Sequence, residues 1–323
     1  MTNISNKIIS NKIVVIAIGG NALATDDGCN DAQSQSVAAV KTAAHIVDAV
    51  KAGFKVILTH GNGPQVGFIL ERSELAKASV PVVPMDYATA DTQGSIGYMF
   101  QRALHNEFVR RGMLSHQAQS IVTQVIVNPK DPAFLKPSKP IGGYMNKMLA
   151  QQLAHENNWQ VMEDAGRGWR RCVPSPKPQE IVEIEVIKEL LETNTVIIAA
   201  GGGGIPVMKN ADGTLQGVEA VIDKDLSSCL LAKQLQAEKF VVVTAVEKVA
   251  IFFGTPKQAQ LGQVSVAKIK QYNEEGHFPA GSMGPKIAAV IDFVESTRRT
   301  AIITDIANLA DALQGEAGTI ISP

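Results

Sequence analysis

Short apolar runs alternate with longer segments of helical periodicity along this chain. The runs that have the character of buried strands are Ile13–Ile18, Lys55–Thr59, Ser120–Val127, Val196–Ala200, Phe240–Ala245 and Ala301–Thr304. The segments between them predict helices over Gln33–Ala52, within Pro64–Lys77, Thr89–Arg111, Gln179–Glu192, Asp225–Gln236, near Val266–Glu275 and Met283–Ser296. Strands that alternate with helices form βαβ units, so the pattern predicts an α/β fold with a mainly parallel sheet.

The pattern changes between Pro129 and Pro178, where the sequence becomes rich in proline and glycine. Only one short stretch in this region, Asn146–Glu156, has helical character. Such punctuated sequence breaks regular elements. We therefore expect residues 129–178 to be an insertion that projects from the α/β body.

Composition limits the classes of partner. The chain has 323 residues, of which 45% are hydrophobic, and a net charge of −1, so it can bury a large core as one α/β domain or as two lobes. The near-neutral balance provides no long basic stripe for nucleic acid, and no run of eighteen apolar residues that would span a membrane is present. We expect neither nucleic-acid nor membrane partners.

The N-terminal region has some features of an export signal, because Lys7 and Lys12 precede an apolar run and Ala22-Leu23-Ala24 resembles a cleavage site. That run is very short and ends in Gly-Gly-Asn, so we favour a cytoplasmic protein. The cysteines are scattered and form no C-x-x-C motif, which predicts free thiols in a reducing compartment. They are Cys29, Cys172 and Cys229.

Three glycine-containing corners follow strand-like runs. They are Gly19-Gly20-Asn21, Gly61-Asn62-Gly63 and Gly201-Gly202-Gly203-Gly204. Glycine lets the backbone approach a ligand closely, so that successive N–H groups point at an anion. Any one corner alone could be a tight strand-to-helix turn, but three together predict a phosphate site at the carboxyl edge of the sheet.

The common phosphate-binding fingerprints are absent. The sequence has no G-x-x-x-x-G-K-[ST] motif, which excludes a P-loop. The segment from Gly61 to Gly67 comes close to the dinucleotide pattern, but its third glycine is one place late. A Rossmann dehydrogenase is therefore a weak alternative, which NAD binding without phosphoryl transfer would favour.

Charged residues stand next to several predicted helix starts. Lys224 and Asp225 follow the apolar run Ala220–Ile222, where Asp225 is a candidate helix cap, and Lys286 follows Gly281-Ser282-Met283-Gly284-Pro285. Lys139 lies in the projecting segment. A single lysine is usually a solvated surface residue. Lys286 nevertheless stands beside a predicted helix N-terminus, where anions bind.

Longer motifs along most of the chain resemble those of the carbamate kinases. The matching segments are IGGNAL (18–23), THGNGPQVG (59–67), DTQGSIGY (91–98), DPAFLKPSKPIG (131–142), EDAGRGWRRCVPSPKP (163–178), GGGGIPV (201–207), GVEAVIDKDL (217–226), EEGHFPAGSMGPK (274–286) and GEAGTII (315–321). They occur in the family's order from about Ile13 to the C-terminus.

The resemblance implies an amino-acid-kinase fold, which is a three-layer α/β sandwich with an open, mainly parallel sheet, two lobes and a protruding subdomain. Within a single domain spanning 1–323, residues 1–221 would form the carbamoyl-phosphate-side lobe, with 129–178 inserted as a lid, and 222–323 the nucleotide-side lobe. It also implies a cytoplasmic homodimer. Such a protein interconverts ATP plus carbamate with ADP plus carbamoyl phosphate using Mg²⁺, commonly toward ATP in arginine-type catabolism.

The resemblance also implies roles for individual residues. Lys224 and Lys286 would contact the transferring phosphoryl group, and Lys139 would reach it from the lid. Asp225 would orient lysines or help to place Mg²⁺, which the nucleotide phosphates would otherwise hold. The first two glycine corners would serve the carbamoyl-phosphate side. Phosphoryl transfer requires such positioning and charge neutralisation rather than a covalent nucleophile.

Some positions depart from related families. Acetylglutamate and glutamate kinases carry a lysine where this chain has Ala17, and Lys139 would replace that charge. Gly143, Gly284 and Phe252 stand where carbamate kinases often have Pro, Leu and Asn. For the run containing Arg167, Arg170 and Arg171 we favour a structural role that joins the insertion to the body over phosphate binding. A regulator of this fold without turnover is the alternative function.

Overall fold

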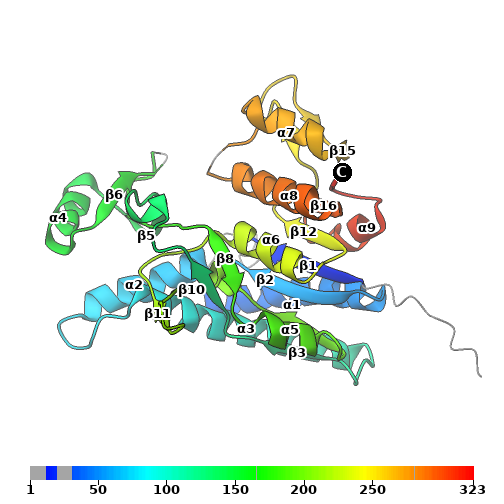
Figure 1. The fold of residues 1–323 in the computed structure, drawn as a ribbon, viewed down its shortest axis with the longest axis horizontal. Coiled ribbons are helices and arrows are strands. Elements are labelled where there is room, and N and C mark those ends of the chain that lie inside the picture. The colour runs from blue at the N-terminus through cyan, green and yellow to red at the C-terminus, as the bar shows by residue number, and fades with distance from the viewer. Residues whose placement is uncertain (1–11, 20–30, 165, 280) are drawn as a thin grey trace, which may run out of the picture.

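The computed structural model describes residues 12–19, 31–164, 166–279 and 281–323 (Figure 1). Its main sheet has eight strands in the order β15-β17-β16-β12-β1-β2-β9-β3. All neighbours are parallel except β16 and β17. The strands are β1 (Ile13–Ile18), β2 (Lys55–His60), β3 (Gln117–Ser120), β9 (Thr195–Ile198), β12 (Lys239–Val243), β15 (Gln263–Ser265), β16 (Thr300–Thr304) and β17 (Thr319–Ser322). The predicted α/β class with a mainly parallel sheet is confirmed.

Helices cover both faces of this sheet, because alternate side chains of its strands enter two separate cores. Val15 and Ala17 of β1 enter the core beneath α5 (Ile184–Leu190), α6 (Lys224–Gln234), α7 (Val266–Glu274) and α8 (Met283–Thr297). Ile16 and Ile18 enter the core beneath α1 (Ala32–Lys51), α3 (Met85–Arg110) and α9 (Leu309–Gln314). A strand buried on both faces reads as one continuous apolar run, as β1 does. The result is a three-layer sandwich.

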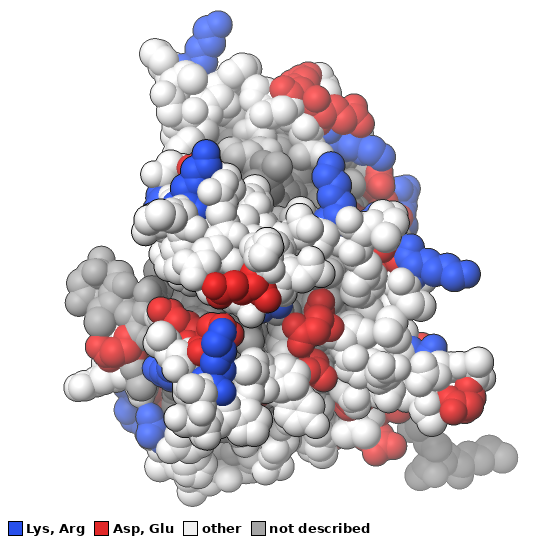
Figure 2. All heavy atoms as spheres, turned by 90° about the vertical axis from the view of Figure 1, so that its left-hand side faces the viewer, with Lys and Arg blue, Asp and Glu red and all other residues white. Residues whose placement is uncertain are grey.

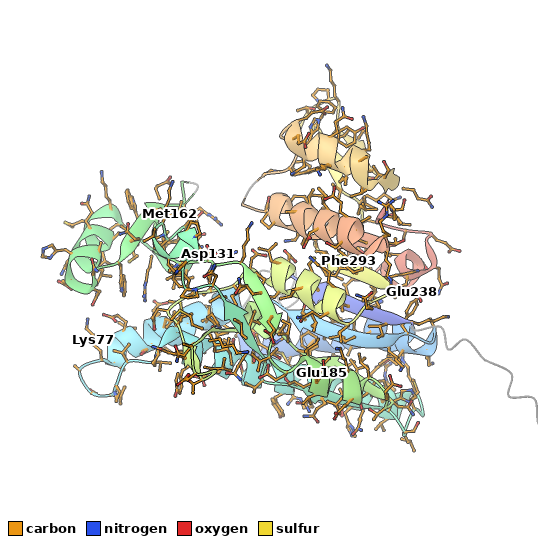
Figure 3. All side chains as sticks on the ribbon, in the orientation of Figure 1. Lys77, Asp131, Met162, Glu185, Glu238 and Phe293 are labelled. Carbon is orange, nitrogen blue, oxygen red and sulfur yellow. The ribbon has the colours of Figure 1, made fainter. Side chains whose placement is uncertain are left out.

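Aromatic side chains fill part of the first core. Phe293 of α8 lies over the sheet against Phe240 of β12, with ring centroids 5.5 Å apart (Figure 3). Both side chains are fully buried. Helix starts are fixed locally, as in α1, where the Asp31 side chain accepts hydrogen bonds from the backbone N–H groups of Gln33 and Ser34.

Smaller sheets extend the body. One has the order β11-β10-β4-β8 and consists of β4 (Gln124–Val127), β8 (Pro178–Ile181), β10 (Ile205–Lys209) and β11 (Leu215–Gly217). A short hairpin joins β13 (Ala250–Ile251) to β14 (Ala259–Gln260). Helix α2 (Gly63–Ala76) follows β2 directly. No helix in the described part of the chain is long and apolar enough to cross a membrane.

The Pro- and Gly-rich segment forms a projecting subdomain, which we call the lid (residues 129–178; Figure 1). It contains the short turn η2 (Pro132–Phe134), a three-stranded antiparallel sheet and α4 (Lys147–Asn157), close to the predicted helix. Its strands are β5 (Lys139–Met145), β6 (Gln160–Glu163) and β7 (Trp169–Val173). In Figure 2, which faces this end of the molecule, acidic and basic side chains are mingled, and no extended basic area is visible on that face.

Two predicted elements were wrong. The run Ser120–Val127 is not one strand, because it divides between β3 and β4 in different sheets. Between them the buried Thr123 donates its backbone N–H to Gln93 Oε1 (2.8 Å), which takes the chain out of the main sheet. The predicted helix Gln179–Glu192 begins as strand β8, since pairing with β4 outweighs helix propensity there, and continues as α5.

Candidate active site

Three strand ends meet at one edge of the main sheet. Strand β2 lies between β1 and β9, and all three run parallel. Gly19 follows β1, Gly61 follows β2, and Gly201 follows β9 after two alanines. The sequence places their backbone N–H groups at the carboxyl ends of neighbouring strands, where α/β sheets bind ligands. Gly20 and Asn21 of the first corner lie outside the described residues.

The four-glycine corner does not begin a helix. It makes one 3₁₀ turn, η3 (Gly201–Gly203), and continues as β10. Gly202 and Gly203 have φ angles of +67° and +96°. A Cβ atom on Gly202 would lie 2.1 Å from Asn62 Nδ2, and one on Gly203 would lie 2.2 Å from the Ile222 carbonyl oxygen. Only glycine lets this corner pack so closely against Asn62 and against the backbone of Ile222.

Buried polar side chains fix the corners. Asn62 donates from Nδ2 to Thr92 Oγ1 (2.9 Å), and Gln93 donates to the Gly201 carbonyl oxygen (3.0 Å). Thr92 and Gln93 both belong to α3, and their side chains are almost fully buried. Ser227 of α6 donates to the Gly203 carbonyl oxygen (2.6 Å). The corners are therefore held rigidly, as a preorganised binding site requires.

Two lysines share the carboxylate of Asp225. Lys224 Nζ lies 2.6 Å from Oδ1, and Lys286 Nζ lies 3.2 Å from Oδ2. Asp225 is only 3% exposed. Burial alone would raise its pKa, but the two ammonium groups lower the pKa below its ordinary value. The carboxylate thus stays charged and orients both lysines, which come from the first turns of α6 and α8.

Asp223 also lines this site and makes two contacts in it. Its Oδ1 accepts the backbone N–H of Asp225 (2.9 Å), so Asp223 is the N-cap of α6. The expectation that Asp225 caps the helix was wrong, because α6 begins one residue earlier, at Lys224. The other oxygen of Asp223, Oδ2, accepts a hydrogen bond from Lys139 Nζ (2.9 Å). One carboxylate therefore joins the lid to the start of α6.

These groups surround one cavity of about 240 Å³. The predicted site residues that line it are Gly61, Asn62, Gly63, Lys139, Gly202, Lys224, Asp225 and Lys286. Gly19, Gly201 and Gly203 are not among the lining residues. The sequence reasoning missed Asp223 and Ser282 as lining residues. Asp223 stands directly before Lys224 in the sequence, but its role depends on α6 beginning at Lys224 rather than at Asp225.

The arginine run has mixed contacts. Arg167 pairs with Asp164 (3.2 Å), and the guanidinium group of Arg171 lies over the Trp159 ring and 3.7 Å from Glu219 of the body. Arg170 donates to the Gly142 carbonyl oxygen (3.1 Å). Arg170 also lines the cavity beside Lys139, which gives it access to a ligand that the favoured structural role did not include.

Phe252 and Gly284, two of the positions that depart from the carbamate kinase pattern, lie where the backbone or its neighbours restrict the side chain. Phe252 has a φ angle of +52°, a left-handed conformation that Asn tolerates better than Phe. Its ring contacts His277 edge-on, with centroids 4.4 Å apart. A Cβ atom on Gly284 would lie 3.1 Å from the Pro279 carbonyl oxygen, so a larger residue would shift the start of α8. Of the cysteines, Cys172 and Cys229 are free and buried, and Cys29 lies outside the described residues.

His60 lies beneath the glycine corners and gives a pH prediction. It is fully buried and donates from Nδ1 to the Gly61 carbonyl oxygen (3.0 Å). Burial, chiefly, lowers its pKa from 6.5 to about 4. Between these two values the unfolded chain binds a proton at His60 and the folded chain does not. The contribution of His60 to the free energy of unfolding is therefore complete above pH 6.5 and falls by about 3 kcal/mol as the pH drops toward 4.

We expect His60→Gln to flatten this part of the stability profile. Urea unfolding between pH 4.5 and 7 measures the slope, and the exposed His155→Gln is the control, which should leave the slope unchanged. An unchanged slope in His60→Gln would contradict the assignment.

Comparisons with known proteins agree with this geometry. Residues 12–305 match the Amino acid kinase family. The chain is 46% identical to carbamate kinase of Pyrococcus furiosus over 97% of this chain and 99% of that protein. It is also 46% identical to carbamate kinase 2 of Enterococcus faecalis, over 95% and 98%. The solved carbamate kinase from Giardia lamblia bound to AMP-PNP has a TM-score of 0.90 and 41% identity, covering 97% of this chain and 99% of that one.

Proposed function

Since this chain belongs to the amino acid kinase family, and within it to the carbamate kinases, we propose that it transfers a phosphoryl group between ATP and carbamate. The reverse direction makes ATP from ADP and carbamoyl phosphate. The observation that carries this proposal is the convergence of Lys139, Lys224 and Lys286 on one cavity with two glycine corners. The Rossmann alternative is overturned by the family match.

The residues divide the work as phosphoryl transfer requires. The transferred group carries negative charge on its equatorial oxygens, and catalysis consists mainly of alignment and charge neutralisation. Lys224 and Lys286, each paired with one carboxylate oxygen of Asp225, would neutralise that group from the 222–323 nucleotide-side lobe. Lys139 would reach it from the lid, on the 1–221 carbamoyl-phosphate side. The N–H groups of the glycine corners would hold the substrate phosphate.

Mg²⁺ would accompany the nucleotide. In the described part of the chain, no group of three or more His, Cys, Asp or Glu side chains could hold a metal ion. Both carboxylate oxygens of Asp225 already contact lysines. These residues fit an ion held chiefly by nucleotide phosphates and water, with Asp225 beside it. When bound, Mg²⁺ neutralises charge on the phosphate oxygens.

A coupled assay tests the function directly. The purified chain should form ATP from ADP and carbamoyl phosphate, and hexokinase with glucose-6-phosphate dehydrogenase reports that ATP as NADPH. A chain that binds ADP without forming ATP would be a regulator of this fold rather than an enzyme.

Substrate selectivity provides a second prediction. We expect no phosphorylation of acetylglutamate, aspartate or glutamate, because the position where acetylglutamate and glutamate kinases carry a lysine is Ala17, which is fully buried in β1. The measurement is ADP release from ATP with each amino acid, with carbamate as the positive control. Appreciable ADP release with any of the three would contradict the proposed specificity.

We also propose a homodimer that associates through α1 and α3. These helices pack side by side, and Arg102 of α3 donates to Ser36 Oγ of α1 (2.9 Å). Their outer faces expose apolar side chains, including Val40 at 52% and Tyr98 at 60%. Exposed apolar faces of this kind favour isologous association.

Light scattering after gel filtration tests the dimer. Tyr98→Glu should shift the mass from two chains toward one. Leu135→Glu, at an exposed lid position, should not. A wild-type mass of one chain would overturn the proposal.

Free Cys172 and Cys229 support the proposed cytoplasmic location, where the enzyme would serve arginine-type catabolism.

A further inference from the structure

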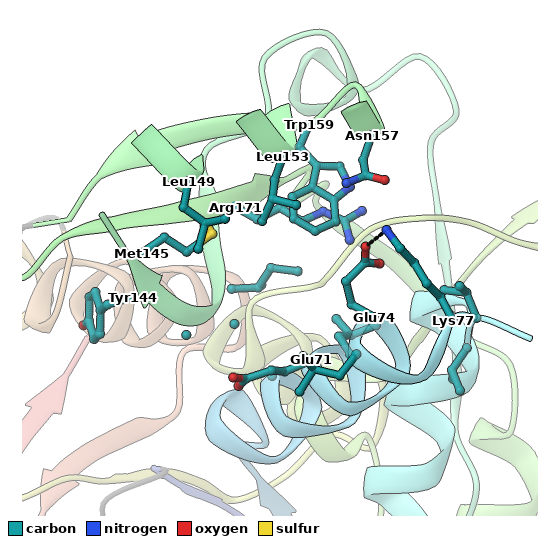
Figure 4. A pocket seen from close by; sticks show the side chains of 18 of the residues that line it. Glu71, Glu74, Lys77, Tyr144, Met145, Leu149, Leu153, Asn157, Trp159 and Arg171 are labelled. Carbon is teal, nitrogen blue, oxygen red and sulfur yellow. Dashed lines mark hydrogen bonds and ion pairs between the residues drawn. The ribbon is translucent and has the colours of Figure 1, made fainter. Parts of the chain in front are cut away.

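A second cavity lies between the lid and the body, next to the active-site cavity along β5. Its volume is about 800 Å³, which is within the range of small-molecule sites. One wall consists of α2 and the 82–84 segment, and the other consists of the β5 turn and α4 (Figure 4). Because the two walls belong to the body and to the lid, an occupant would contact both.

The walls are largely apolar. From the body come Leu70 and Val82, and from the lid come Leu149, Leu153 and Trp159. Figure 4 shows Leu149, Leu153 and Trp159 above the cavity and α2 with Glu71 and Glu74 below it. A surface of this composition favours the apolar body of a small ligand and leaves a few polar groups to orient it.

The charges around the cavity are nearly all paired. Glu74 pairs with Lys77, and Arg171 lies 3.7 Å from Glu219 (Figure 4 shows the first pair). Glu71 differs from them, because within the described residues it has no hydrogen-bond or ion-pair partner. Its Oε2 would lie 3.6 Å from a Cβ atom on Gly143 in the β5 turn, so its carboxylate extends across to the lid.

We propose that this cavity binds a small organic amine with an apolar or aromatic body, whose ammonium group pairs with Glu71. The lining residues Glu71, Glu74 and Glu219 carry three negative charges against two positive charges on Lys77 and Arg171, so the cavity favours a cation over an anion. The apolar body packs against Trp159 and the leucines. A ligand in this position fixes the lid relative to α2.

The cavity is connected to the active site through the lid itself. Ile141 lines both cavities, two residues from Lys139. A Cβ atom on Gly67 of α2 would lie 3.2 Å from Gly142 Cα, so body and lid touch at this point without side chains between them. Ligand binding in this cavity thus biases where Lys139, earlier on the same strand, lies in the active site.

Fluorescence tests the site without any substrate, so its result is independent of phosphoryl transfer. The chain has two tryptophans, and Trp169→Phe leaves Trp159 as the reporter. The probes are 2-phenylethylamine, 2-phenylethanol and phenylacetate, which share one body and differ in charge. We expect the amine to change Trp159 emission saturably and to bind more tightly than the alcohol, with phenylacetate weakest.

Glu71→Gln tests the charge. It should weaken amine binding about twofold to fivefold and leave the alcohol unchanged. Glu189→Gln, an exposed residue on α5, is the matched control and should change neither. Leu70→Phe, which fills the cavity, should weaken all three probes. Bound amine should also slow hydrogen exchange in α2, β5 and α4 together.

Three results would each overturn the proposal. One is the absence of any saturable change in Trp159 emission. Another is binding of phenylacetate or the alcohol as tightly as the amine. The third is amine binding that is unaffected by Glu71→Gln in a variant whose circular dichroism matches wild type.

Discussion

Lys224→Ala is expected to lower the turnover number by on the order of 10²-fold or more, because a point charge on the transferring group acts mainly in the transition state. Lys224 is positioned for this by Asp225, 2.6 Å away, at the first turn of α6. Lys286 remains beside Asp225 in the variant, so the buried carboxylate keeps one partner. The measurement is the coupled ATP assay, with circular dichroism to verify the fold.

A matched control is available on the same helix. Lys233 also pairs with a carboxylate, that of Asp292 at 3.0 Å, but does not line the active-site cavity. Lys233→Ala should therefore retain turnover. Near-normal turnover in Lys224→Ala would reject its catalytic role. Lys224→Arg separates charge from geometry, because guanidinium keeps the charge but not the compact shape of an ammonium group.

Lys139→Ala is expected to lose activity by about 10²-fold while the protein still binds ADP. Lys139 belongs to the lid, and its Nζ contacts Asp223 at the start of α6. Proposed ADP contacts lie beyond Ile222, so removing Lys139 leaves them in place. Lids that close over a phosphoryl site exclude water and complete the set of charges. Calorimetric ADP binding and the coupled assay measure the two effects separately.

Hydrogen exchange follows the lid itself. Amides across 129–178 should become more protected when carbamoyl phosphate and ADP, or a bisubstrate mimic, are bound. Lys136→Ala, an exposed lid lysine, serves as the control and should keep activity. Unchanged exchange together with normal turnover in Lys139→Ala would make the insertion a structural or dimer-contact element.

The sequence predicted the main sheet well because its central strands are buried on both faces. Such strands, for example Ile13–Ile18, stand out as continuous apolar runs with the same bounds in the structure. The lid strands escaped prediction because they are half-exposed and interrupted by Gly142, Gly143 and prolines. Their pairing depends on contacts between β5, β6 and β7 that no local pattern carries.

The candidate site shows the same division. Glycine corners and lysines could be found in the sequence because their residue types are unusual at strand ends and helix starts. The role of Asp223 could not, because it depends on whether α6 begins at residue 224 or 225. The place of Arg170 in the cavity depends on the pairing of β7 with β5, which the arginine run itself does not reveal.

The ion pair between Lys139 and Asp223 holds the lid to the start of α6 only weakly. We call molecules with this pair formed latched and molecules without it unlatched. Lys139 has a side chain 41% exposed, and an ion pair as open to water as this contributes about 1 kcal/mol or less. That amounts to no more than a severalfold excess of latched over unlatched molecules. Dissolved salt, which screens such pairs, would shift the ratio further toward unlatched molecules. We therefore expect the resting enzyme to sample both arrangements, and an arriving phosphate to compete with Asp223 for the same ammonium group.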